Sequence, residues 1–162
     1  MEKNLKSTAI NYGTYLGIIL VLVTVMAYAI DLELLTKWWL GIILFFAVLT
    51  FGIVSTVKAK GVLNGFISFK QAFSSYFITI AIGILINSAA SLLLFNFIDT
   101  DAAEVLQEKV IETTSEMMIN FGAPQTEIDK ALADMENQSQ FSFMNQLKSI
   151  AFQLIFYSVI GF

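Results

Sequence analysis

The stretch QAFSSYFITIAIGILINSAASLLLFNFI, residues 71–98, contains no charged residue. A helix needs roughly 20 apolar residues to cross about 30 Å of hydrocarbon, so this stretch is long enough to span a membrane. Three more uncharged stretches occur, at residues 7–30, 38–57 and 149–162, of which the last is the shortest. The pattern predicts an all-α, polytopic membrane protein.

We predict a single membrane domain, residues 1–162, with four transmembrane helices at about residues 9–30, 38–57, 75–98 and 144–162. As a helix, residues 149–162 would cover only about 21 Å, which is less than the hydrocarbon thickness. The last span must therefore start near Phe143, with Lys148 reaching toward the interface, or the natural chain must be longer. We expect it to continue beyond Phe162.

Lysine placement predicts the orientation, because basic residues in short loops stay on the cytoplasmic side. Lys3 and Lys6 precede the first span, and Lys58, Lys60 and Lys70, with no acidic residue among them, separate the second span from the third. We therefore expect both termini to be cytoplasmic. The turn 31–37 and the acidic stretch 99–146 would lie outside the cytoplasm, and Trp38 and Trp39 would mark that interface as aromatic anchors.

The amino terminus has an alternative interpretation. Lys3 and Lys6, the apolar run 16–26 and the tripeptide Ala27-Tyr28-Ala29 together resemble a secretory signal with cleavage after Ala29. The uncharged segment is longer than a usual signal core, which favours a retained helix. The intact mass of the purified protein distinguishes the two.

Small residues predict where the spans pack against each other. Gly13 and Gly17 are one helical turn apart in the first span and would let another helix approach closely. In the third span, a narrow stripe of small and polar residues recurs at helical spacing, formed by Gly83, Asn87, Ala90 and Ser91.

Asn87 lies near the middle of the third span, where an unpaired amide is costly because no water can bond to it. We expect an interhelical hydrogen bond to Thr24, Thr50 or Gln153, worth on the order of 1 kcal/mol. The alternative is a substrate site.

Ten of the thirteen acidic residues lie between Asp99 and Glu136, in a segment with helical periodicity. A first helix is predicted over residues 102–121, with Asp101 and Glu104 as a capping box and Gly122 and Pro124 as its stop. Its apolar face would consist of Ala103, Leu106, Val110, Met117 and Phe121, within roughly 60° of one another at 100° per residue.

A second helix is predicted over residues 125–138, with Ile128, Leu132 and Met135 on one face. Thr126 and Asp129 would cap its start. The two helices together form a predicted amphipathic hairpin at about residues 101–138, outside the cytoplasm. We expect the hairpin to bury its apolar faces against itself or against the ends of the spans.

A ladder of four glutamates occupies the polar side of the first of these helices, at Glu104, Glu108, Glu112 and Glu116. Carboxylates can bind divalent cations. Like charges at this spacing repel by only a few tenths of a kcal/mol in water, however, so we interpret the ladder as a solvated face. It is also the surface that we expect a membrane or envelope protein partner to contact.

Aromatic and basic side chains meet where the chain enters the third span. Phe66, Phe69 and Phe73 recur at helical spacing, beside Lys58, Lys60 and Lys70. We expect this segment to lie in the headgroup boundary and to attract anionic lipid, by about 1 kcal/mol per lysine. A protein-docking or re-entrant element is the alternative.

Composition disfavours several classes of function. Cysteine and histidine are absent, so thiolate nucleophiles, imidazole bases and the usual zinc ligands are missing. The apolar interiors of the spans carry no Asp, Glu, Lys, Arg or His, which disfavours ion-coupled transport. Clustered basic residues that could track nucleic-acid phosphates are also missing. We therefore predict a non-enzyme with no catalytic residue, metal site or cofactor, and no nucleic-acid partner.

Certain motifs suggest a family. Asn11-Tyr12-Gly13 with Gly17 in the first span, SFKQAF at residues 68–73, and a long acidic insert before the last span resemble the family catalogued as domain of unknown function 4199. The resemblance implies a four-span protein of the bacterial inner membrane with no assigned activity, so it transfers no site residue. It also implies a full final span with a basic tail, whereas this chain ends at Gly161-Phe162.

Two functional hypotheses follow. The first is a non-enzymatic assembly, scaffolding or envelope-associated factor that binds its partner through the acidic hairpin. The second is a pore or facilitator for a small neutral solute, formed by a homo-oligomer, with Asn87, Ser88 and Ser91 along a polar path.

Overall fold

The computed structural model describes residues 2–162, and all regular elements in this range are helical. The α-helices are α1 (Glu2–Ile30), α2 (Trp38–Val62), α3 (Phe69–Leu93), α4 (Thr100–Asn120), α5 (Gln125–Asn137) and α6 (Phe143–Gly161). A 3-10 helix, η1 (Leu32–Thr36), joins α1 to α2, and a π-helical turn, η2 (Leu94–Ile98), follows α3. The predicted all-α class is confirmed.

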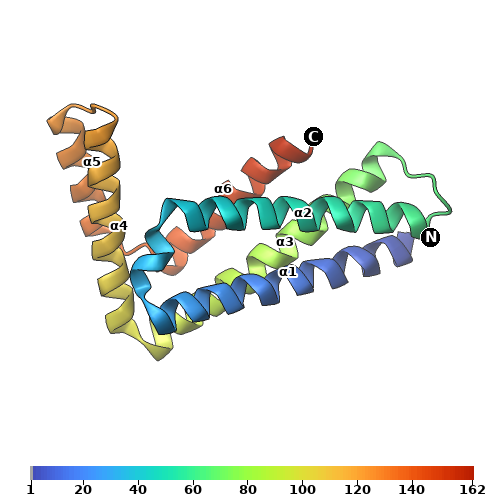
Figure 1. The fold of residues 1–162 in the computed structure, drawn as a ribbon, viewed down its shortest axis with the longest axis horizontal. Coiled ribbons are helices and arrows are strands. Elements are labelled where there is room, and N and C mark those ends of the chain that lie inside the picture. Colours follow the sequence, from blue (N-terminus) through green and yellow to red (C-terminus); the bar gives the residue numbers. More distant parts are fainter. Residues whose placement is uncertain (1) are drawn as a thin grey trace.

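By length and composition, three segments can cross a membrane: Lys3–Ile30, Trp38–Val62 and Phe69–Ile98. The helices α1, α2 and α3 lie against one another in an elongated bundle, and α6 lies against α3 (Figure 1). The assignment of α6 as a fourth span stays a prediction.

The helices extend past the segments predicted to cross hydrocarbon. α1 is helical from Glu2, α2 continues to Val62, and α3 begins at Phe69. Apolar content marks only the part of a helix that lies in lipid, whereas backbone hydrogen bonding continues through the charged flanks until a turn interrupts it. The segment 58–70, expected to connect two spans, is thus mostly helical.

A tight turn separates α2 from α3. Asn64 and Gly65 both have positive φ, 60° and 89°, a conformation that glycine and asparagine adopt most easily. Ser68 then caps α3 in a capping box: its side chain accepts from the backbone N–H of Gln71, and the Gln71 side chain accepts from the backbone N–H of Ser68. Local residues therefore reverse the chain at this end of the bundle.

The bundle core is apolar and centres on α3. Its buried members are Leu16, Leu20, Val48, Tyr76, Ile80 and Ile84, and Ile150, Leu154 and Tyr157 of α6 pack against them. Many other large apolar side chains of α1, α2 and α6 are exposed, including Ile42, Ile43 and Phe46. That outward apolar surface is what a lipid-facing bundle requires.

The pair α4 and α5 lies across one end of the bundle, and the N-terminus lies at the other end with the α2–α3 turn (Figure 1). A second apolar cluster fixes this pair to the bundle, formed by Leu94, Phe95, Ala102, Leu106 and Phe141. Gly122, with a φ of 74°, ends α4 as expected.

Three local predictions in this pair are wrong. The cap of α4 is Asp99 rather than Asp101, because the Asp99 carboxylate accepts from the backbone N–H of Ala102, 2.9 Å away. α5 begins after Pro124 without a side-chain cap, so Thr126 does not cap it. The apolar face of α4 is only partly covered, since Met117 and Phe121 are exposed.

Candidate functional site

The residues singled out for helix packing meet along the contact between α1 and α3. A Cβ atom added at Gly13 would lie 2.8 Å from Cβ of Ile82, and one added at Gly17 would lie 2.7 Å from Cβ of Ile86. From the other side, a Cβ added at Gly83 would lie 2.6 Å from the Leu16 side chain. Each glycine therefore accepts a larger side chain of the facing helix, and the helices approach closely.

Asn87 lies farther along the same contact. The Thr24 hydroxyl lies 3.2 Å from Oδ1 of Asn87 and 3.0 Å from the carbonyl oxygen of Leu20. Thr24 is one of the three partners that the sequence suggested, whereas Thr50 is exposed on α2. Ala90 and Ser91, which complete the stripe on α3, are half-buried.

Three buried hydroxyl groups form a polar cluster that the sequence analysis did not anticipate. Oγ1 of Thr79 lies 2.7 Å from Oγ of Ser55 and 3.1 Å from the carbonyl oxygen of Ala9, and Ser55 lies 3.1 Å from Oγ of Ser75. All three hydroxyl residues have an exposed fraction of 0%. The cluster therefore connects α1, α2 and α3 by hydrogen bonds in the interior of the bundle.

A signal for this cluster was present in the sequence. Ser75 and Thr79 are one helical turn apart, so their hydroxyls lie on one face of α3. Ser55 lies on a different helix, and its contact with them depends on how α2 and α3 pack. Serine and threonine can also bond to their own helix backbone, so spacing alone does not reveal a bond between helices.

One short hydrogen bond connects the bundle to α4. The Tyr28 hydroxyl, near the end of α1, donates to Oδ2 of Asp99 at 2.6 Å. The Asp99 carboxylate also caps α4 through Ala102. These hydrogen bonds stabilise the charged carboxylate and hold the pKa of Asp99 below its ordinary value. A single side chain thus fixes the start of α4 and attaches it to α1.

The four glutamates of the ladder are exposed on α4, as expected of a solvated face. Together they line one side of a groove of about 870 Å³ between α4 and α5, which also contains Glu136. The apolar lining of the groove comes from Phe95, Ala103, Ile111 and Leu132. Within residues 2–162, no group of three or more carboxylates is arranged to hold a metal ion.

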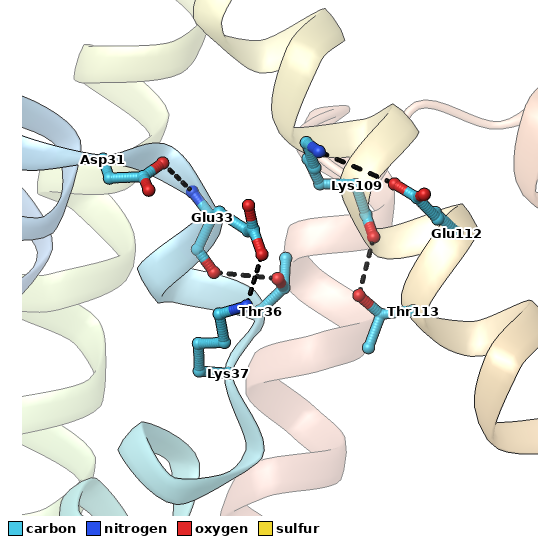
Figure 2. Close-up of polar contacts among 7 residues, drawn as sticks. All are labelled: Asp31, Glu33, Thr36, Lys37, Lys109, Glu112 and Thr113. Carbon is cyan, nitrogen blue, oxygen red and sulfur yellow. Dashed lines mark hydrogen bonds and ion pairs between the residues drawn. The ribbon is translucent and has the colours of Figure 1, made fainter.

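A second set of charges lies between η1 and α4. Glu33 of η1 forms an ion pair with Lys37, the residue after η1, and Lys109 lies 3.6 Å from Glu112 on α4 (Figure 2). The hydrogen bond to Lys37 lowers the pKa of Glu33 and the same contact raises the pKa of Lys37. Lys109 lowers the pKa of Glu33 further, so opposite charges face each other across this contact.

The residues assigned to the lipid interface lie at the far end of the bundle from α4. Lys58 and Lys60 are exposed in the last turns of α2, Phe66 is exposed in the turn, and Phe69 and Lys70 are exposed at the start of α3. Phe73 is half-buried and stacks on Phe69. The expected headgroup segment therefore comprises the last turns of α2, the turn that follows and the first turns of α3.

A comparison with protein families identifies the chain. The family described as "Protein of unknown function (DUF4199)" matches residues 11–162. The chain belongs to this family. No curated protein and no solved structure matches the sequence.

The DUF4199 match covers the contacts described above. It includes the glycines of α1, the buried hydroxyl cluster of α2 and α3, and the acidic groove of α4 and α5, and it begins after Lys3 and Lys6. The family description names no activity, so a role for this DUF4199 protein must be argued from its own residues.

Proposed function

We propose that the protein is a four-span protein of the bacterial inner membrane, with both termini in the cytoplasm. α6 supports the fourth span by connecting the two ends of the bundle. Next to its start, Phe141 packs on Phe95 with ring centroids 4.7 Å apart; after its end, Phe162 packs on Phe69 at 5.4 Å. Its 19 residues are about 29 Å long as a helix, close to the hydrocarbon thickness.

The orientation follows from the same bundle ends. Exposed Lys3, Lys6, Lys58, Lys60 and Lys70 belong to the ends of α1, α2 and α3 that lie away from α4. Because lysines in short loops stay on the cytoplasmic side, the α4–α5 pair is on the opposite, outer side.

In this arrangement the protein acts as a non-enzymatic assembly or scaffolding factor, and the α4–α5 pair is its partner-binding surface. The groove between the two helices carries the proposal, because it combines five carboxylates with an apolar lining. A protein interface needs apolar area for affinity and complementary charge for selectivity and association rate. The hydrogen bond between Tyr28 and Asp99 would hold this surface in place relative to the membrane.

Charge indicates the chemistry of the partner. Residues 99–136 contain ten acids and only two lysines, Lys109 and Lys130. Glutamates four residues apart on α4 would face Lys or Arg at matching spacing on an amphipathic segment of the partner. The partner is therefore an envelope or membrane protein with a basic, amphipathic segment.

Photocrosslinking in native membranes tests this role. A photoreactive phenylalanine analogue at Ser115, which lines the groove, should capture a second protein, whereas the analogue at Lys130, which does not line it, should not. Replacement of all four ladder glutamates by glutamine should abolish the capture.

A charge-matched control separates the groove from net charge. Asp101, Glu127, Asp129 and Asp134 are exposed acids that do not line the groove, and their neutral amide variants change the net charge by the same amount. Capture should survive in this control. Equal loss of capture in both quadruple variants, or only self-crosslinks at Ser115, would contradict the proposal.

The pore hypothesis has less structural support. It requires Asn87, Ser88 and Ser91 to line a path, but Asn87 faces Thr24 across the contact with α1 and Ser88 is only 8% exposed. Solute flux through liposomes that disappears in Asn87→Leu would favour the pore over the scaffold.

A further inference from the structure

The two halves of α4 have different surroundings. In the first half, Ala102 and Leu106 are buried, with exposed fractions of 6% and 5%, against the end of the bundle. No residue of the second half is buried. The helix lies across the bundle end (Figure 1), so the bundle does not cover the second half of α4, whose neighbours are α5 and η1.

The uncovered half nevertheless continues the apolar face of the covered half. At 100° per residue, Leu106, Val110, Met117 and Phe121 fall within about 60° of one another. Met117 is 49% exposed and Phe121 is 87% exposed. Large apolar groups therefore extend from the second half of α4 in the direction in which Leu106 packs.

That direction leads to the first turn of α2. A groove of about 760 Å³ separates the two helices, lined on α4 by Val110, Thr113 and Met117 and on the other side by Lys37, Trp38 and Gly41. Trp38 is 74% exposed. Exposed tryptophan at the end of a span marks the membrane–water interface, so Met117 lies over this interface.

We propose that the second half of α4 rests on the outer leaflet of the bilayer, with Met117 and Phe121 inserted among the headgroups and phospholipid in the groove beside Trp38. The inference rests on the proposed membrane insertion of the bundle. The Glu104 and Glu108 carboxylates lie on the opposite side of α4, do not line this groove and stay in water.

Two observations favour lipid over a second protein copy as the occupant. The groove is continuous with the outward apolar surface of α2, where Ile42 and Ile43 are exposed and where lipid is expected in any case. The polar lining of the groove carries both signs of charge, from Lys37 and Lys109 and from Glu33, Glu112 and Glu116, which matches a zwitterionic headgroup with its phosphate and its ammonium group.

Spin labels in proteoliposomes test the proposal, and the absence of native cysteine allows single-cysteine labelling directly. Labels at Met117→Cys and Phe121→Cys should collide more readily with oxygen, which concentrates in lipid, than with a water-soluble nickel complex. Ile119→Cys is the matched control. Ile119 is 58% exposed in the same turn but points to the opposite side of the helix, so its label should favour the nickel complex.

Three results would overturn the proposal. Labels at Met117 and Phe121 that favour the nickel complex as strongly as the label at Ile119 would place this face in water. If neither oxygen nor the nickel complex reaches the labels at Met117 and Phe121, and the spectra show spin–spin broadening, a second copy of the chain covers this face. If a label at Ile43→Cys favours the nickel complex, α2 itself is not inserted in the membrane, and both the proposed membrane insertion and this inference fail. In the first two results the label at Ile43 still favours oxygen, so the two kinds of failure can be told apart.

Discussion

Glycine at three positions, where no Cβ atom is present, determines how closely α1 approaches α3. Gly13, Gly17 and Gly83 each face a larger side chain of the other helix at a distance that leaves no room for a Cβ atom. In lipid, where apolar surface gains little by leaving the solvent, helices associate through such close contacts and through hydrogen bonds. The close approach at the glycines therefore contributes to the stability of the α1–α3 contact.

Gly17→Ala should destabilise the protein, because the new Cβ would lie 2.7 Å from Ile86 and one helix would have to move. Overpacking of this kind costs about 1 to 3 kcal/mol. Gly41→Ala is the control, since a Cβ at Gly41 would have no neighbour within 4 Å. Unfolding in detergent should show a loss of stability for Gly17→Ala but not for Gly41→Ala. Equal stability of the two variants would contradict the close approach of α1 and α3.

The buried hydroxyl groups can be tested with a substitution that preserves shape. Thr79→Val removes the contacts to Ser55 and Ala9 and should destabilise the protein by on the order of 1 kcal/mol. Thr50→Val makes the same change on the exposed side of α2 and should cost less than Thr79→Val. If Thr79→Val is as stable as Thr50→Val, the cluster contributes nothing to packing.

The start of α4 depends on one carboxylate that has two hydrogen-bond partners. Asp99 caps the helix through Ala102 and accepts the hydroxyl hydrogen of Tyr28. The negative charge of Asp99 also interacts favourably with the positive, N-terminal end of the α4 dipole. The orientation of the α4–α5 pair on the bundle should consequently depend on the charge of Asp99.

Tyr28→Phe should lower the melting temperature at neutral pH, because it removes this bond without changing the ring. The folded protein holds the pKa of Asp99 below its ordinary value of 3.8, so the contribution is fully present above that value and is lost as the pH falls through the lower, folded pKa. The difference between the wild type and Tyr28→Phe should therefore narrow in acid. A difference that stays constant as the pH is lowered from neutral through the whole titration of Asp99 would contradict the role of the carboxylate.

The elements were predictable from sequence to different degrees. Uncharged length identified α1, α2 and α3, and apolar periodicity identified α4 and α5, because these signals lie within one segment. Helix ends were less predictable, since Asp99 and Asp101 are both good caps and the choice depends on the tertiary contact with Tyr28. The exposure of Met117 depends on where the bundle ends, which periodicity within α4 cannot indicate.

At the scale of the whole molecule, the two ends of the bundle differ in charge. Lysines surround the end with the N-terminus and the α2–α3 turn, and carboxylates surround the α4–α5 pair at the other end. The sequence predicted this separation because each group of charges directly precedes or follows a span in the chain, so the direction of the span determines the end at which the group lies. The groove between α4 and α5 and the Ser55–Ser75–Thr79 cluster were not predictable, because each combines residues whose proximity results from packing.

Site-directed labelling of single cysteines tests whether a membrane separates the lysine-bearing end of the bundle from the α4–α5 pair. Glu127 on α5 and Lys60 on α2 are both exposed, and the chain has no cysteine to interfere. In intact inner-membrane vesicles of cytoplasmic-side-in orientation, a membrane-impermeant thiol reagent should label Glu127→Cys at once and Lys60→Cys only after detergent is added. Labelling of Glu127→Cys only after detergent, or of both variants before it, would contradict the account.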